Sequence, residues 1–117
     1  MTPTQQGAYA VQFDAYQVAL QMIRSLRDIV PKIRMHNPSL AVQIDKAAPS
    51  VALNLNEGRR RIGKDRKHLW RVAAGSADEV RACLDVAEAA GYLDLDEIEH
   101  TLTLIDRVLA MTWRMTH

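Results

Sequence analysis

The chain has 117 residues, and its 48% hydrophobic and 25% charged content, with only five Gly and four Pro, argues against disorder or a long linker. This length predicts one folded domain spanning residues 1–117. Aromatic content is 5%, and Ala, Leu, Val and Ile dominate the apolar residues, which favours helices over sheets. The formal net charge is only +1, so nucleic-acid binding would have to come from the placement of the charges.

No stretch of the sequence approaches the roughly 18 apolar residues of a membrane span. Residues 1–12 lack the basic and apolar regions of a secretion signal. We therefore expect a cytoplasmic protein without membrane contact. The single cysteine, Cys83, excludes an intramolecular disulfide and is interpreted as a small buried helix residue rather than a reactive thiol.

The first element is expected to be a loose lead-in over residues 1–12, followed by a helix over about 13–33. At 100° per residue, the apolar residues of this helix cover roughly 200° of its circumference. That arc is wider than a single core requires.

The second helix has a defined start, because Asn37 is a good N-cap and Pro38 suits the first helical position. It is expected to run to about Arg60. Pro49 falls in its middle, where proline ordinarily kinks or ends a helix. An apolar row keeps its phase across Pro49, so we predict one kinked helix. The row consists of Leu40, Ile44, Ala47, Val51, Leu55, Gly58 and Ile62.

The third helix is expected to follow a tight turn at Gly63 and Lys64, with Asp65 as its N-cap. It should end at about Ala90, because Gly91 is a suitable residue just beyond a helix end.

A fourth helix is expected from Asp94 or Asp96 to about Met115, with another wide apolar arc that includes Trp113. The predicted fold is all-α, an up-down-up-down antiparallel four-helix bundle. The apolar surface left over on the first and fourth helices predicts a homo-oligomer formed through them.

A row of polar residues follows the helical period beside the apolar face of the second helix. It consists of Gln43, Ser50, Asn54, Glu57 and Arg61. Pairing the second and third helices about the turn places Ser50 opposite Ser76. The same pairing places Gly75 opposite Ala52, where a glycine would let two helix backbones approach.

We interpret the polar residues of this hairpin as a structural row that sets the helix register by hydrogen bonding. Its members are Ser50, Asn54, Glu57, Ser76 and Glu79. Glu57 also stands four residues before Arg61, the favoured order for an ion pair within a helix. A catalytic pair of Glu57 and Glu79 is disfavoured, because hairpin pairing separates them by about two turns.

Metal binding is a further candidate function, because helical bundles can hold metal ions through Glu-x-x-His pairs. Glu97 and His100 have this spacing, whereas Asp65 and His68 only imitate it loosely. No phosphate-binding glycine loop, nucleophile elbow or zinc-type Cys/His spacing appears. We therefore expect no catalytic residue, no metal, no cofactor and no enzyme activity.

Charge is distributed unevenly along the chain. Residues 59–71 carry a net charge of +6, and residues 78–106 carry −8. The basic residues are Arg59, Arg60, Arg61, Lys64, Arg66, Lys67 and Arg71. They form a candidate nucleic-acid-binding site. A solvated turn and a surface that docks onto the acidic end of another subunit or protein are the alternatives, because no aromatic platform interleaves with these charges.

Four short motifs carry a resemblance to a known family over nearly the whole chain. They are Ala47-Ala48 followed by Ser50-Val51, Asn54-x-x-Glu57-Gly58-x-x-Arg61, Ala73-x-Gly75-Ser76-x-x-Glu79, and Ala90-Gly91-Tyr92-Leu93. They resemble the four-helix-bundle family associated with intervening sequences in bacterial 23S ribosomal RNA genes, which includes relatives of the diversity-generating retroelement accessory protein. The resemblance implies a cytosolic bundle that assembles as a homopentamer, associates with RNA or other nucleic acid, and has no established catalysis.

Two departures from the family pattern affect this region. Ala52 stands where the family commonly has a proline, and Pro49 precedes Ser50 instead. Arg59 and Arg60 replace an aromatic or glycine-rich pair, which makes the turn more basic. The sequence thus predicts a non-enzymatic oligomer that binds RNA through its basic turn, or else a structural or adaptor protein that contacts a protein partner and uses this turn in assembly.

Overall fold

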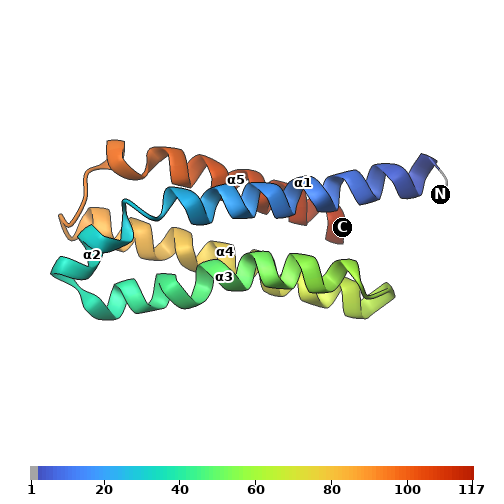
Figure 1. Cartoon of the computed structure of the whole chain (residues 1–117), viewed down its shortest axis with the longest axis horizontal. Coiled ribbons are helices and arrows are strands. Elements are labelled where there is room, and N and C mark those ends of the chain that lie inside the picture. Colours follow the sequence, from blue (N-terminus) through green and yellow to red (C-terminus); the bar gives the residue numbers. More distant parts are fainter. Residues whose placement is uncertain (1–2) are drawn as a thin grey trace.

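The computed structural model describes residues 3–117, with side chains from Asp14 onward, and this part of the chain forms five α-helices and no strand. The helices are α1 (Pro3–Ser25), α2 (Val30–His36), α3 (Pro38–Arg59), α4 (Gly63–Ala89) and α5 (Leu95–Thr116). Figure 1 shows α1, α3, α4 and α5 lying lengthwise together, with the short α2 at the end where α1 leads into α3. The predicted all-α antiparallel bundle of four long helices is confirmed.

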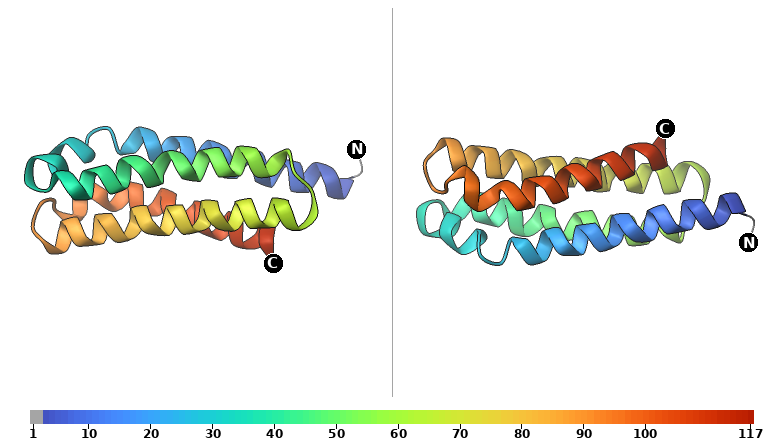
Figure 2. Two further views of the ribbon diagram at one scale, coloured as in Figure 1. Left: turned by 90° about the horizontal axis from the view of Figure 1, so that it is seen from below. Right: turned by 90° about the horizontal axis from the view of Figure 1, so that it is seen from above.

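The long helices enclose one apolar core. Helix α3 packs on α4, α4 on α5, α5 on α1, and α1 on α3, an arrangement visible from two directions in Figure 2. Met22, Ile44, Leu84 and Ile105, one from each long helix, are fully buried at its centre. None of the described helices is long and apolar enough to cross a membrane.

The first helix ends earlier than predicted. Helix α1 stops at Ser25, residues 26–29 form turns, and α2 then begins at Val30. The single helix expected over 13–33 is therefore wrong. Pro31 suits this break, because it has no N–H to donate to the preceding turn and stands in the first turn of α2, where none is needed.

The first helix also begins earlier than predicted, at Pro3. Residues 3–12, expected to be a loose lead-in, are helical, and residues 1–2 lie outside the described part of the chain. Proline is tolerated in the first turn of a helix, and the glutamines and alanines that follow it have good helix propensity.

The second predicted helix is confirmed as α3. Its Asn37 N-cap accepts a hydrogen bond at Oδ1 from the Leu40 N–H over 3.0 Å, and Pro38 occupies the first turn. The helix continues without interruption through Pro49 to Arg59.

The start of α4 differs from the prediction. The N-cap is Ile62, in an extended conformation, and Gly63 follows with a φ of +60°. Asp65 lies within the first turn and is not the cap. A glycine accepts this positive φ readily, so the N-cap lies three residues earlier than the predicted Asp65.

The connection from α4 to α5 follows the predicted cap signals. Gly91 has a φ of +80°, its N–H donates to the Glu88 carbonyl over 3.0 Å, and the Tyr92 N–H donates to the Ala87 carbonyl over 2.9 Å. These bonds form a Schellman motif. Asp94 then caps α5 in a capping box with Glu97.

Candidate nucleic-acid interface

The polar row crosses the α3–α4 pair at the predicted register. Ser50 Oγ and Ser76 Oγ lie 2.8 Å apart, within hydrogen-bonding distance. Asn54 Nδ2 donates to the Ser50 carbonyl over 2.8 Å and to Ser50 Oγ over 3.0 Å. These three half-buried side chains therefore form one connected group between the two helices.

Glu57 and Glu79, the two carboxylates assigned to the row, do not bridge the helices in the described part of the structure. Glu57 accepts hydrogen bonds from Arg61 Nη2 at 2.9 Å and Nε at 3.1 Å, the ion pair that their spacing predicted. Glu79 is exposed. Burial raises the pKa of the Cys83 thiol, and the negative charge of Glu79 raises this pKa further.

The glycine that permits close packing is Gly58, and the prediction for Gly75 is wrong. A Cβ added at Gly75 would have no heavy atom within 4 Å apart from its own helix backbone and chain neighbours. A Cβ at Gly58 would lie 2.5 Å from Trp70 Nε1 and 2.6 Å from Trp70 Cδ1. Helix packing places the buried Trp70 ring against the last turn of α3, whereas Gly75 faces open space on the surface of α4.

Coupling between Ser50 and Ser76 can be measured in a double-mutant cycle of unfolding free energies. We expect Ser50→Ala and Ser76→Ala to be coupled by about 1 kcal/mol, because each substitution removes the same hydrogen bond. The matched control pairs Ser50→Ala with Ser39→Ala, an exposed serine at the start of α3, and should be additive. Additive behaviour of the Ser50 and Ser76 pair would contradict the contact.

Arg66 is a structural member of the predicted basic site. Its Nε donates to the Gly58 carbonyl and its Nη2 to the Arg59 carbonyl, both over 3.2 Å. The guanidinium also lies over the Trp70 ring, 5.4 Å from the ring centroid. Arg66 therefore adds side-chain hydrogen bonds to the last carbonyls of α3, where a cation also complements the helix dipole.

Two further arginines are held by side chains of the bundle. Arg59 Nη2 donates to Asn56 Oδ1 over 2.8 Å, and the Arg59 guanidinium lies 5.8 Å from the centroid of the Tyr16 ring. Arg61 is engaged by Glu57, as described above. Arg59 and Arg61 are therefore less available to a ligand than their exposed neighbours.

The other four cations are exposed at one end of the bundle. The side chains of Arg60, Lys64 and Lys67 make no hydrogen bond or ion pair with any described residue. Arg71 makes one long hydrogen bond, from Nη2 to the Thr116 carbonyl over 3.4 Å, which leaves its other donors available. We call these four residues the cation cluster. Lys64, Lys67 and Arg71 share a face of α4 because they recur at intervals of three and four residues.

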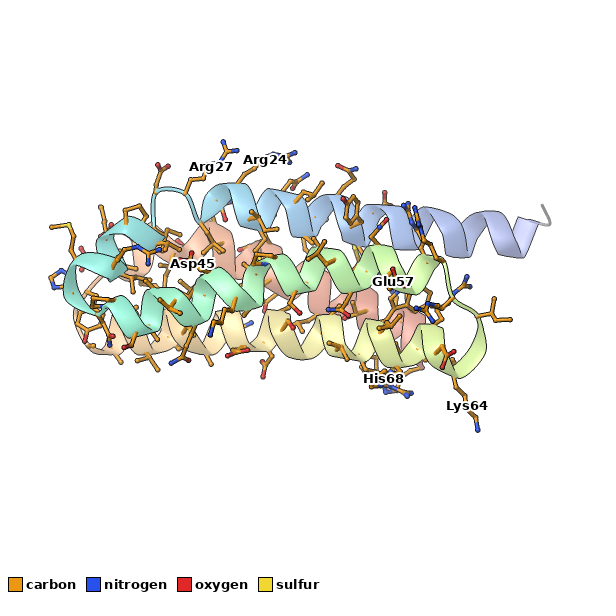
Figure 3. All side chains as sticks on the ribbon, turned by 60° about the horizontal axis from the view of Figure 1, so that its bottom comes forward. Arg24, Arg27, Asp45, Glu57, Lys64 and His68 are labelled. Atoms are coloured by element: carbon orange, nitrogen blue, oxygen red, sulfur yellow. The ribbon has the colours of Figure 1, made fainter. Side chains whose placement is uncertain are left out.

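The position of the cluster is clear in the structure. Figure 3 shows Lys64 projecting outward where α3 turns into α4, with His68 nearby on α4. Arg24 projects from the C-terminal end of α1, and Arg27 projects from the turn that follows it, both distant from Lys64 (Figure 3).

The acidic segment lies toward the opposite end of the long axis. Figure 1 places the α4–α5 connection, with its acidic flanks, at the far end of the bundle from the α3–α4 connection. There Lys32 Nζ lies 2.5 Å from Glu97 Oε2, and this contact raises the pKa of Lys32 and lowers the pKa of Glu97. Within the described residues, no group of three His, Cys, Asp or Glu side chains gathers to hold a metal ion.

An aromatic feature beside the cation cluster was missed in the sequence. The exposed Trp113 stacks on His117, with ring centroids 4.5 Å apart and planes 11° apart. A groove of about 260 Å³ separates these rings from Arg71 and Ala74 of α4. Antiparallel packing brings the end of α5 beside the start of α4, so residues distant in sequence become neighbours. In the sequence, only the place of Trp113 in the wide apolar arc of the fourth helix could have drawn attention to it.

The fold places the chain in the class of small all-α antiparallel helical bundles. The model of the 23S rRNA-intervening sequence protein family matches residues 9–114, so the chain belongs to that family.

One solved structure shares the fold. It is a protein of unknown function from the S23 ribosomal protein family of Bacteroides thetaiotaomicron VPI-5482, with a TM-score of 0.73 and 13% sequence identity. The alignment covers 91% of this chain and 97% of that one. No curated protein has significant sequence similarity to the chain.

Proposed function

We propose that the protein is a non-enzymatic RNA-binding bundle whose cation cluster contacts phosphates. The observation that carries this proposal is the gathering of Arg60, Lys64, Lys67 and Arg71 on one exposed end, without a carboxylate partner among the described residues. Clustered cations bind the phosphate backbone without regard to sequence, and the release of counterions drives the association.

Three cations elsewhere on the surface have carboxylate partners, whereas Arg24, Arg27 and Lys46 have none among the described residues. Lys32 pairs with Glu97, Arg34 with Asp45, and Arg81 with Asp106. The cluster instead concentrates like charges, which repel one another until an anionic partner neutralises them. A merely solvated turn gives no reason for this concentration of unpaired charge.

Assembly would strengthen such binding. Leu20 and Ile23 on α1, with Met111 and Met115 on α5, are only partly buried and pack at the edge of the core. We propose that these flanks associate in a homo-oligomer, for which the family resemblance suggests a homopentamer. Each copy would contribute one cation cluster, and several clusters bound to one RNA would raise the overall affinity.

A salt titration tests the proposed function. We expect a blunt RNA duplex to bind at low potassium chloride and to dissociate as the salt concentration rises. If all four cluster residues contact phosphates, the plot of log K against log salt concentration should have a slope of about −3 to −4 per protomer. Absence of binding at low salt, or a flat plot, would reject the proposal.

A protein partner is the second candidate, because the acidic half of α4 and α5 complements the cation cluster. In that case the cluster docks onto the acidic end of another subunit. Light scattering would then detect dissociation of the assembly at high salt, while the RNA titration would give no binding.

A further inference from the structure

The groove between the start of α4 and the last turns of α5 combines aromatic, apolar and cationic walls. Trp113 and His117 line one side, and Arg71 and Ala74 line the other. Thr112 lies in the floor, fully buried. A volume of about 260 Å³ is sufficient for a single flat ring.

The two aromatic rings are held in a fixed arrangement. His117 Nδ1 lies 3.0 Å from the Trp113 carbonyl oxygen, to which it donates, and 3.1 Å from Thr116 Oγ1. Thr116 Oγ1 in turn donates to the Thr112 carbonyl over 2.9 Å. The rings are nearly parallel, and 61% of Trp113 is exposed, so a third flat ring can join the stack without rearranging the helix.

We propose that this groove stacks an unpaired nucleobase of a bound RNA. The inference rests on the proposed function and names the part of the RNA that this site takes. Arg71 lies in the groove wall, and Lys67 lies one turn before it on the same face of α4. Arg71 and Lys67 are therefore one helical turn apart on α4, and both can bind the phosphates on either side of a base stacked on Trp113. Proteins bind single-stranded nucleic acids through this combination of aromatic platforms and basic side chains.

A second copy of the chain fits this groove less well than a nucleobase. At 100° per residue, Met111 and Met115 lie on the opposite flank of the α5 buried stripe from Leu109 and Trp113. The flank of α5 with Met111 and Met115 can thus take part in self-association, while the flank with Trp113, beside α4, stays open to a ligand. An apolar protein surface on the groove would also cover the Arg71 guanidinium without supplying an anion, which is unfavourable.

The test compares a hairpin RNA that has an unpaired loop with the blunt duplex of its stem. Trp113→Ala should weaken binding of the hairpin about tenfold and leave binding of the duplex unchanged, because only the loop offers a base for stacking. Trp113→Tyr keeps an aromatic face and should retain most of the affinity. Leu53→Ala removes a similarly exposed apolar side chain from α3 and should change neither affinity.

Fluorescence gives an independent readout. Trp70 is buried and Trp113 is exposed, so Trp70→Phe leaves Trp113 as the one tryptophan of the chain. Adding single-stranded oligoadenylate should quench its emission. If Trp70→Phe unfolds the bundle, protection of wild-type Trp113 from acrylamide quenching by the same RNA replaces this measurement. Unchanged emission and unchanged acrylamide quenching at saturating RNA would each overturn the inference.

The outcomes separate the two proposals. If the wild-type protein binds neither hairpin nor duplex, the proposed function fails, and the inference fails with it. If it binds both and Trp113→Ala leaves hairpin binding unchanged, only the nucleobase site is overturned. If Trp113→Ala weakens both equally and reduces the size of the assembly in light scattering, Trp113 is a subunit contact and the inference is again overturned.

Discussion

Gly58→Val is expected to lower the free energy of unfolding by about 3 kcal/mol, because α3 has no room for a side chain where Trp70 crosses it. The added Cβ would lie 2.5 Å from Trp70 Nε1, far inside van der Waals contact. The ring is only 4% exposed, and the Arg66 guanidinium lies over it, so it cannot move aside without opening the core. Urea unfolding followed by far-UV circular dichroism measures the effect.

Gly75→Ala is the matched control, since it also adds a side chain to a glycine within the same helical pair. Open space surrounds the Cβ position there, so alanine should stabilise the protein by up to about 1 kcal/mol through its better helix propensity. The two substitutions should therefore have opposite signs. Equal stability changes at Gly58 and Gly75 would contradict the packing described for Trp70.

Reversing three residues of the cation cluster, as Arg60→Glu, Lys64→Glu and Lys67→Glu together, is expected to weaken duplex RNA binding on the order of a hundredfold or more at about 0.1 M salt. Each lost phosphate contact removes the release of roughly one counterion, so the salt dependence should also become shallower. Arg66 stays unchanged because it caps α3, and Arg71 stays because it contacts the end of α5. Fluorescence anisotropy of a labelled duplex measures both quantities.

The control reverses three exposed cations away from the cluster: Arg24, Arg27 and Lys46. Both triple variants have the same net charge, so any difference in their RNA affinity must come from the location of the reversed charges. Arg24 and Arg27 project from the end of α1 and the turn after it, distant from Lys64 (Figure 3), so the control should bind the duplex much more tightly than the cluster variant. Equal losses in the two variants would mean that binding follows net charge, and the assignment to the cluster would be wrong.

Three helix ends were predictable because their signals are local, whereas both ends of α1 and the start of α4 were not. Asn37, Gly91 and Asp94 act on backbone groups within a few residues, and each occupies the expected cap position. Pro31 and Pro49 have different effects on the helices, and local sequence rules do not distinguish them. Pro49 is accommodated inside α3, whereas Pro31 follows the break between α1 and α2, where the chain must reverse its direction into α3.

The candidate site was only partly predictable. Charge patterning located the seven basic residues of the α3–α4 turn, but it treated them as equivalent. In the structure Arg66 caps α3, Arg61 pairs with Glu57, and the cation cluster stays exposed. Arg66 reaches the carbonyls of α3 because the connection brings the start of α4 close to the end of α3. The order of the residues does not specify that distance.

The sequence by itself determined the helical class, the helix ends marked by Asn37, Gly91 and Asp94, the Ser50–Ser76 register and the separation of basic from acidic charge. Caps and hydrophobic periods act between near neighbours, and a short turn transmits their register across one hairpin. Only the tertiary structure decided that Trp70 covers Gly58 and that Trp113 lies beside Arg71. These contacts join helix faces whose separation is set by the packing of the whole core. The periodic pattern along one helix does not specify that distance.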